Sequence, residues 1–124
     1  MLKLKTKWFD KWSKKNLISD KKLLDILRNI SNNLGVVNLG GELYKIRVNK
    51  EGQGKSGGFR TIVVYRQSEI AIFVYGFSKN VKSNLNKEEL TDFKILSKDL
   101  LSMNKQEYQN LVAQGEFINI KEGL

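Results

Sequence analysis

Apolar and polar residues alternate along the middle third of the chain. In the run LYKIRV, residues 43–48, Lys45 and Arg47 alternate with apolar side chains. Because successive side chains of a β-strand point to opposite faces, this pattern buries one face and places both cations on the other. Residues 59–66 and 70–77 are apolar on both faces, as central strands are, and the three polar residues between them predict a tight hairpin. The pattern therefore predicts three antiparallel strands.

The first 35 residues predict a short edge strand followed by two helices. Leucine and lysine alternate over residues 2–5, which indicates the strand. Three aromatic residues then share one helical face, and core packing is their expected role: Trp8, Phe9 and Trp12. A second helix, capped by Ser19 or Asp20, carries an apolar stripe over residues 23–30 and ends before Gly35. We expect these two helices to cover one side of the sheet.

The last third of the chain again has sequence patterns that are typical of helices. Asn86 and Glu89 have the spacing of a capping box, in which each side chain bonds the backbone amide of the other residue. This box opens a helix with an apolar stripe over residues 90–101. A last helix, at about residues 105–114, ends at a glycine, and residues 116–120 return as an edge strand.

Together these elements predict an α+β fold. At 124 residues and 40% apolar content, the chain is expected to form one domain, residues 1–124, with a modest core. Its sheet is expected to be small, twisted and mainly antiparallel, flanked by the N-terminal and C-terminal helices.

Composition excludes several kinds of chemistry. The chain has no cysteine, so neither a disulfide framework nor a thiolate zinc site is possible. It has no histidine either, and so lacks a common transition-metal ligand and the usual general base at neutral pH. Catalysis would have to come from lysine, arginine, tyrosine, serine or carboxylates, and we expect no metal and no cofactor.

The formal charge of +9 favours a polyanion as partner, since neutralisation of phosphates drives nucleic-acid binding. Residues 1–22 carry eight cationic and two anionic side chains, residues 42–82 carry eight and three, and residues 83–124 carry five and seven. No apolar run reaches the length of a membrane span, and the N-terminus lacks the pattern of a signal peptide. We expect a soluble cytoplasmic protein. A membrane-surface helix is the weaker alternative, because the N-terminal cations fall on most sides of that segment.

A glycine-rich segment, GQGKSGGFR at residues 52–60, connects the strand predicted at residues 43–48 to the strand predicted from residue 59. Its glycines allow positive φ and close approach to a ligand, and Lys55 adds charge, so the loop suits phosphate. The letters GKS resemble the end of a nucleotide-binding P-loop. However, Asn49 stands where the first glycine belongs, and a strand instead of a helix follows. We therefore set ATP and GTP binding aside; an ordinary hairpin connection remains the plainer alternative.

Cations on neighbouring strands can converge, because adjacent strands place their exposed side chains within reach of one another. Such a cluster suits RNA cleavage without a metal: the 2′-hydroxyl attacks the adjacent phosphorus, and the protein positions it, stabilises charge and moves protons. Arg47 and Arg60, with planar and permanently charged side chains, suit the nonbridging oxygens. Lys45 is a candidate general base, because surrounding cations favour its neutral amine.

Further residues are candidates for binding the RNA strand. Lys55, Lys79 and Lys82 would guide its backbone, and Tyr75 would stack on a base, as aromatics do in single-stranded RNA recognition. Phe77 could stack as well, but core packing is its favoured role. Alternating cations on a strand more often form a solvated face, so a nucleic-acid-binding domain without catalysis remains open on this pattern alone.

Residues 39–84 resemble a known family through several motifs in the same order: LGGELYKIR, GQGKSGGFRT and FVYGFSK. They are similar to the RelE/HigB-type toxins of bacterial type II toxin–antitoxin modules, in the subgroup that reads GKSGG followed by an aromatic and arginine. The likeness extends more loosely over nearly the whole chain. It implies a microbial-ribonuclease-like sheet flanked by helices, cleavage of mRNA, often in the ribosomal A site, and neutralisation by a cognate antitoxin.

The resemblance also assigns residues. It places Lys45 and Arg47 on the basic pair of the first central strand, and Arg60 against the scissile phosphate. Lys79 falls near a basic residue that contacts RNA after the last strand. The chain departs from the family pattern at Phe59, where tyrosine is usual, and at Val81-Lys82, where a Glu-Arg pair is common.

The sequence thus predicts a metal-independent mRNA endoribonuclease toxin with mRNA and a helix-turn-helix antitoxin as partners. Three alternatives stay open: a non-catalytic RNA-binding or ribosome-binding module, a gyrase-inhibiting toxin of the same fold, and a degenerate toxin kept as a structural partner. Lys45, Arg47 and Arg60 are all present, and this argues against a gyrase-inhibiting toxin, which keeps the same sheet but lacks this set of cations.

Overall fold

The computed structural model of the chain describes residues 1–32, 35–49 and 58–122. These residues form helices and strands in the following order: β1 (Leu2–Thr6), α1 (Lys7–Lys15), α2 (Asp20–Arg28), the 3₁₀ turn η1 (Ile30–Asn32), β2 (Val36–Gly40), β3 (Leu43–Val48), β4 (Phe59–Arg66), β5 (Ile70–Ser78), α3 (Lys87–Leu101), α4 (Lys105–Ala113) and β6 (Phe117–Asn119).

In this part of the chain the strands form one six-stranded sheet of order β2-β3-β4-β5-β1-β6. Every neighbouring pair is antiparallel except β1 and β5, which run parallel. The predicted α+β class with a mainly antiparallel sheet is confirmed. The prediction of β1 as an edge strand is wrong, because β6 pairs with its outer side and Leu4 is fully buried.

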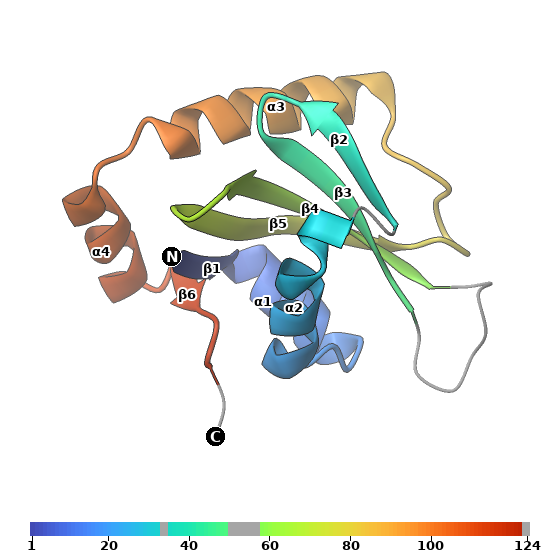
Figure 1. Cartoon of the computed structure of the whole chain (residues 1–124), viewed down its shortest axis with the longest axis horizontal. Coiled ribbons are helices and arrows are strands. Elements are labelled where there is room, and N and C mark those ends of the chain that lie inside the picture. The colour runs from blue at the N-terminus through green and yellow to red at the C-terminus, as the bar shows by residue number, and fades with distance from the viewer. Residues whose placement is uncertain (33–34, 50–57, 123–124) are drawn as a thin grey trace.

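Helices cover both faces of the sheet (Figure 1). The first face packs against α1 and α2, as predicted, with side chains such as Phe9, Leu23 and Phe73 in one core cluster. The second face packs against α3 and α4, with Leu100 and Tyr108 in the other cluster. The central strands are therefore buried on both sides, which explains their nearly continuous apolar sequence.

Side-chain caps fix the helix starts that the sequence predicted. Ser19 caps α2 by accepting from the amide of Lys22. Asn86 and Glu89 form both halves of the capping box at α3, so that prediction is confirmed. A second such box, Asn104 with Glu107, opens α4. Such caps stabilise a helix by about 1 kcal/mol each, because they satisfy amides that have no partner within the helix.

Two features of the first half were not predicted. The helix α2 ends at Arg28, and the residues expected to complete it form the turn η1 instead. The edge strand β2 follows, paired antiparallel with β3. It has no buried position along its length and lacks a clean alternation of apolar and polar residues, so its sequence carries no strand signal.

Trp12 joins α1 closely to the sheet at Gly76. A Cβ atom at Gly76 would lie 2.3 Å from the indole ring of Trp12, so only glycine leaves space for this contact. The ring of Trp12 also packs edge-on against Phe59 and lies 5.4 Å from the ring of Phe9. This packing sets the helix beside the part of β5 that extends beyond the end of β1.

Candidate functional site

Three cations predicted from the sequence lie on one face of the sheet. Arg47 on β3 is directly opposite Arg60 on β4, and Arg60 is opposite Phe77 on β5. Two residues along, Lys45 is opposite Ile62, which is opposite Tyr75. Directly opposed residues of antiparallel strands project their side chains to the same face. We call Lys45, Arg47 and Arg60 the basic cluster.

Electrostatics make the basic cluster receptive to an anion. Burial of the Arg60 guanidinium and the positive charge of Arg47 both lower the pKa of Arg60. Each effect means that the charge is held at a cost in free energy, because water is partly removed and a like charge lies nearby. A bound phosphate would relieve both costs and could accept paired hydrogen bonds from the planar guanidinium groups.

Asn84 was not predicted as a site residue, yet it contacts the basic cluster. Its Oδ1 accepts a hydrogen bond from Lys45 Nζ at 3.1 Å and another from the backbone amide of Leu85 at 2.9 Å. The residue lies between β5 and α3, two positions before the capping residue Asn86. Sequence spacing identified the cap, but the approach of this segment to β3 depends on the fold.

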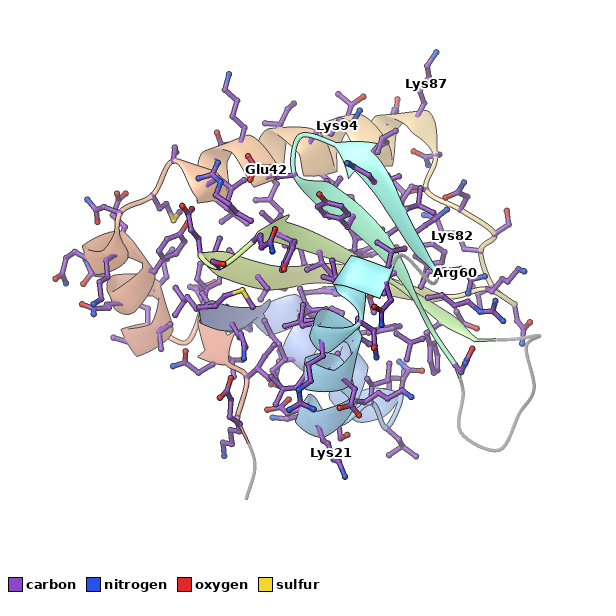
Figure 2. The ribbon with its side chains drawn as sticks, viewed as in Figure 1. Lys21, Glu42, Arg60, Lys82, Lys87 and Lys94 are labelled. Carbon is purple, nitrogen blue, oxygen red and sulfur yellow. The ribbon has the colours of Figure 1, made fainter. Side chains whose placement is uncertain are left out.

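Lys82 lies beside the aromatic end of the same face. Its Nζ is 5.7 Å from the ring centre of Tyr75 and 6.0 Å from that of Phe77. Figure 2 shows Lys82 and Arg60 at the same end of the sheet. The Lys82 ammonium also pairs with Glu89, and this hydrogen bond raises the pKa of Lys82. Lys82 therefore stays cationic at neutral pH, with part of its charge balanced by Glu89.

Tyr75 lies within a group of aromatic rings. Its ring centre is 4.9 Å from that of Trp8 on α1, 5.1 Å from Phe93 on α3 and 6.0 Å from Phe77. Phe77 is only 5% exposed, so its predicted packing role is confirmed. Trp8 is 47% exposed, so the expectation that it packs in the core is wrong for this residue.

Two further RNA contacts were predicted from the sequence, Lys55 and Lys79. Lys55 falls outside the described residues, as does most of the glycine-rich loop. Lys79 is exposed after β5, and its backbone amide donates to the carbonyl of Gly58. A Cβ atom at Gly58 would lie 2.7 Å from the carbonyl oxygen of Val48, so this glycine is needed for the close approach of two strands.

Tyr108 belongs to the core. It is buried, and its hydroxyl donates a hydrogen bond to the carbonyl of Leu100. Burial raises the pKa of Tyr108 above its ordinary value. This tyrosine holds α4 against the end of α3 and sits in the same apolar cluster as Phe117.

Among residues 1–32, 35–49 and 58–122, no group of three or more aspartate, glutamate, histidine or cysteine side chains is placed to hold a metal ion. No described helix is both long enough and apolar enough to cross a membrane.

The fold and the site define a small basic α+β protein whose sheet presents clustered lysine and arginine on one face. Comparison with protein families agrees with the resemblance noted in the sequence. Residues 1–120 match the family described as the RelE toxin of the RelE/RelB toxin-antitoxin system, so the chain belongs to the RelE toxin family. It is thus the toxin of a toxin–antitoxin module, and an antitoxin is its implied partner. Among curated proteins, none matches the chain significantly.

Proposed function

We propose that this toxin is a metal-independent endoribonuclease that cleaves mRNA and thereby inhibits translation. The observation that carries the proposal is the basic cluster: Lys45, Arg47 and Arg60 come from two adjacent strands and share one face of the sheet. A cluster of this kind can bind a phosphodiester and stabilise the extra negative charge that develops on it during cleavage.

The proposed reaction is an in-line attack by the ribose 2′-oxygen. Lys45, as the general base, takes the proton from the 2′-hydroxyl while the new bond from the 2′-oxygen to phosphorus forms. Arg47 and Arg60 donate hydrogen bonds to the nonbridging oxygens. The bond to the 5′-oxygen breaks, and this oxygen takes a proton from solvent. The products carry a 2′,3′-cyclic phosphate and a 5′-hydroxyl.

The proposed setting follows from the family resemblance. The substrate is mRNA in the cytoplasm, in the ribosomal A site, and the silencing partner is a helix-turn-helix antitoxin encoded beside the toxin. The charge of +9 supports both partners, because it attracts RNA and also an anionic antitoxin segment laid across the basic face.

The test is cleavage of a defined mRNA with and without ribosomes, in EDTA, with analysis of the new RNA ends. Lys45→Ala and Arg60→Ala are each expected to lower the cleavage rate about 100-fold or more, because each removes a proton acceptor or a charge-stabilising donor. Lys87→Ala is the charge-matched control, since Lys87 projects away from the sheet at the start of α3 (Figure 2). Its rate is expected to stay within about twofold of wild type.

Other results would identify the alternatives. Saturable RNA or ribosome binding without new RNA ends would indicate a non-catalytic binding module. A DNA-damage response on induction, with intact mRNA, would indicate a gyrase-inhibiting toxin. Equal loss of activity in Lys87→Ala and Arg60→Ala would contradict a local role for the basic cluster.

A further inference from the structure

We propose that Trp8 forms a stacking site for an RNA base beside the basic cluster. This inference rests on the proposed RNA substrate and extends it: the basic cluster would hold the backbone, and the indole ring of Trp8 would hold the base of a neighbouring nucleotide. Stacking on an aromatic side chain tolerates any base, because every base has a π-face.

The aromatic residues of α1 differ sharply in exposure. Phe9 is fully buried and Trp12 is half-buried, whereas Trp8 is 47% exposed. Single exposed apolar side chains are common, so exposure alone carries no function. The second observation is the pair of contacts that hold Trp8: its ring stacks on that of Tyr75, with centres 4.9 Å apart and planes 29° apart, and also stacks with that of Trp12, with centres 6.2 Å apart. The indole is thus oriented by the same strand that borders the basic cluster.

The position of Tyr75 links this aromatic pair to the basic cluster. Tyr75, Ile62 and Lys45 lie opposite one another across β5, β4 and β3. Neighbouring strands are about 4.8 Å apart, which separates the backbones of Tyr75 and Lys45 by about 10 Å. Lys82 adds a cation 5.7 Å from the Tyr75 ring. Aromatic rings interleaved with cations along one path are the combination that single-stranded nucleic-acid sites use.

Intrinsic fluorescence can test the site directly, because the chain contains only two tryptophans. The probe is a short single-stranded RNA with 2′-O-methyl groups, which cannot be cleaved. Its addition is expected to quench the emission of the wild-type protein with saturation. Trp8→Phe is expected to lose most of this change, since Trp12 is half-buried against Phe9 and Phe59, and Trp8, which stacks on it, is the more exposed of the two.

Affinity for the same RNA, labelled and followed by fluorescence anisotropy, gives the second readout. Trp8→Ala is expected to bind about tenfold more weakly, which matches the loss of one base–aromatic stack. Trp8→Phe keeps a ring and is expected to stay within about threefold of wild type. Ile95→Ala is the matched control, because Ile95 is 56% exposed on α3 and its removal also deletes an exposed apolar side chain. It is expected to leave affinity unchanged.

An unchanged affinity of Trp8→Ala for the uncleavable RNA would overturn the stacking site. Cleavage of RNA by that variant would then support the proposed ribonuclease activity alone. Quenching by the antitoxin with none by RNA would also overturn it, and would make Trp8 part of a protein interface. Binding and quenching without cleavage would leave the stacking site standing while the proposed ribonuclease activity fails. If Trp8→Ala does not fold, Trp8→Leu, which keeps an apolar side chain against Tyr75, gives the same comparison.

Discussion

Lys5 lies at the centre of a buried ion-pair network that joins the N-terminal strand to the first two helices. Its side chain is only 4% exposed, and its Nζ lies 2.8 Å from a carboxylate oxygen of Asp10 and 2.7 Å from one of Asp20. Asp10 also pairs with Lys14, and Asp20 accepts from the backbone amide of Lys121. One of the eight lysines in the basic N-terminal segment therefore serves the fold and is not available to a polyanion.

The protonation states of this network stabilise the folded protein. Burial alone would raise the pKa of Asp10, but hydrogen bonds from Lys5 and Lys14 outweigh it and leave the pKa below the ordinary 3.8. Burial likewise would lower the pKa of Lys5, but Asp10 and Asp20 leave it above 10.5. The contribution of Asp10 is thus present above pH 3.8 and is lost as the pH falls further. The contribution of Lys5 is lost as the pH rises above 10.5.

Lys5→Met is expected to lower the free energy of unfolding by about 3 kcal/mol at pH 7, because it leaves two partly buried carboxylates without their shared cation. The difference from wild type is expected to shrink as the pH falls below 3.8, because the contribution of Asp10 is lost there. Urea denaturation at both pH values measures it. Lys7→Met, at an exposed position of α1, is the control. An equal loss in both variants would contradict the role of the network.

At the scale of elements, the segment from the end of β5 to the first turn of α3 both caps a helix and contacts the candidate site. Glu89 accepts from the amide of Asn86 through Oε1 and pairs with Lys82 through Oε2. Asn84 lies between them and accepts from Lys45. The capping box that starts the helix therefore also holds the Lys82 side chain near the basic cluster.

Glu89→Gln should separate these two roles. Glutamine can keep the capping box, so stability is expected to change by less than about 0.5 kcal/mol. Lys82 loses its anionic partner, so affinity for uncleavable RNA is expected to rise about threefold through a stronger attraction to phosphate. Glu88→Gln changes the net charge equally at an exposed neighbour and serves as control. A similar gain in both variants would show only a general charge effect.

Local patterns predicted most elements, and non-local contacts explain what they missed. Alternation and apolar runs placed β3, β4 and β5, and capping residues placed the starts of α2 and α3. The interior position of β1 depends on pairing with strands that lie far away in sequence, which no local period encodes. The same reason applies to the site. Alternation placed Lys45 and Arg47 on one face, and the expected pairing of neighbouring strands added Arg60, but the contacts of Asn84 and Trp8 with that face arise from tertiary structure.

At the scale of the whole molecule, two regions of the described residues are rich in positive charge. One is the basic cluster with Lys82 at one end of the sheet, and the other is the lysine-rich surface of α1 and α2, from which Lys21 projects (Figure 2). The last third of the chain is slightly acidic. A short RNA held at the basic cluster is therefore expected to make no contact with Lys21.

The salt dependence of RNA affinity measures how many phosphates the basic cluster neutralises. For single strands, the logarithm of the binding constant falls with the logarithm of salt concentration by about 0.7 per phosphate contact, because counterions are released on binding. Because Lys45 is proposed to act as the base, two phosphate contacts at Arg47 and Arg60 predict a slope of about −1.4 for a short uncleavable RNA. Arg60→Ala is expected to make the slope about 0.7 shallower, while Lys21→Ala leaves it unchanged. An Arg60→Ala protein with weaker binding but the wild-type slope would mean that this arginine acts through the fold and does not contact phosphate.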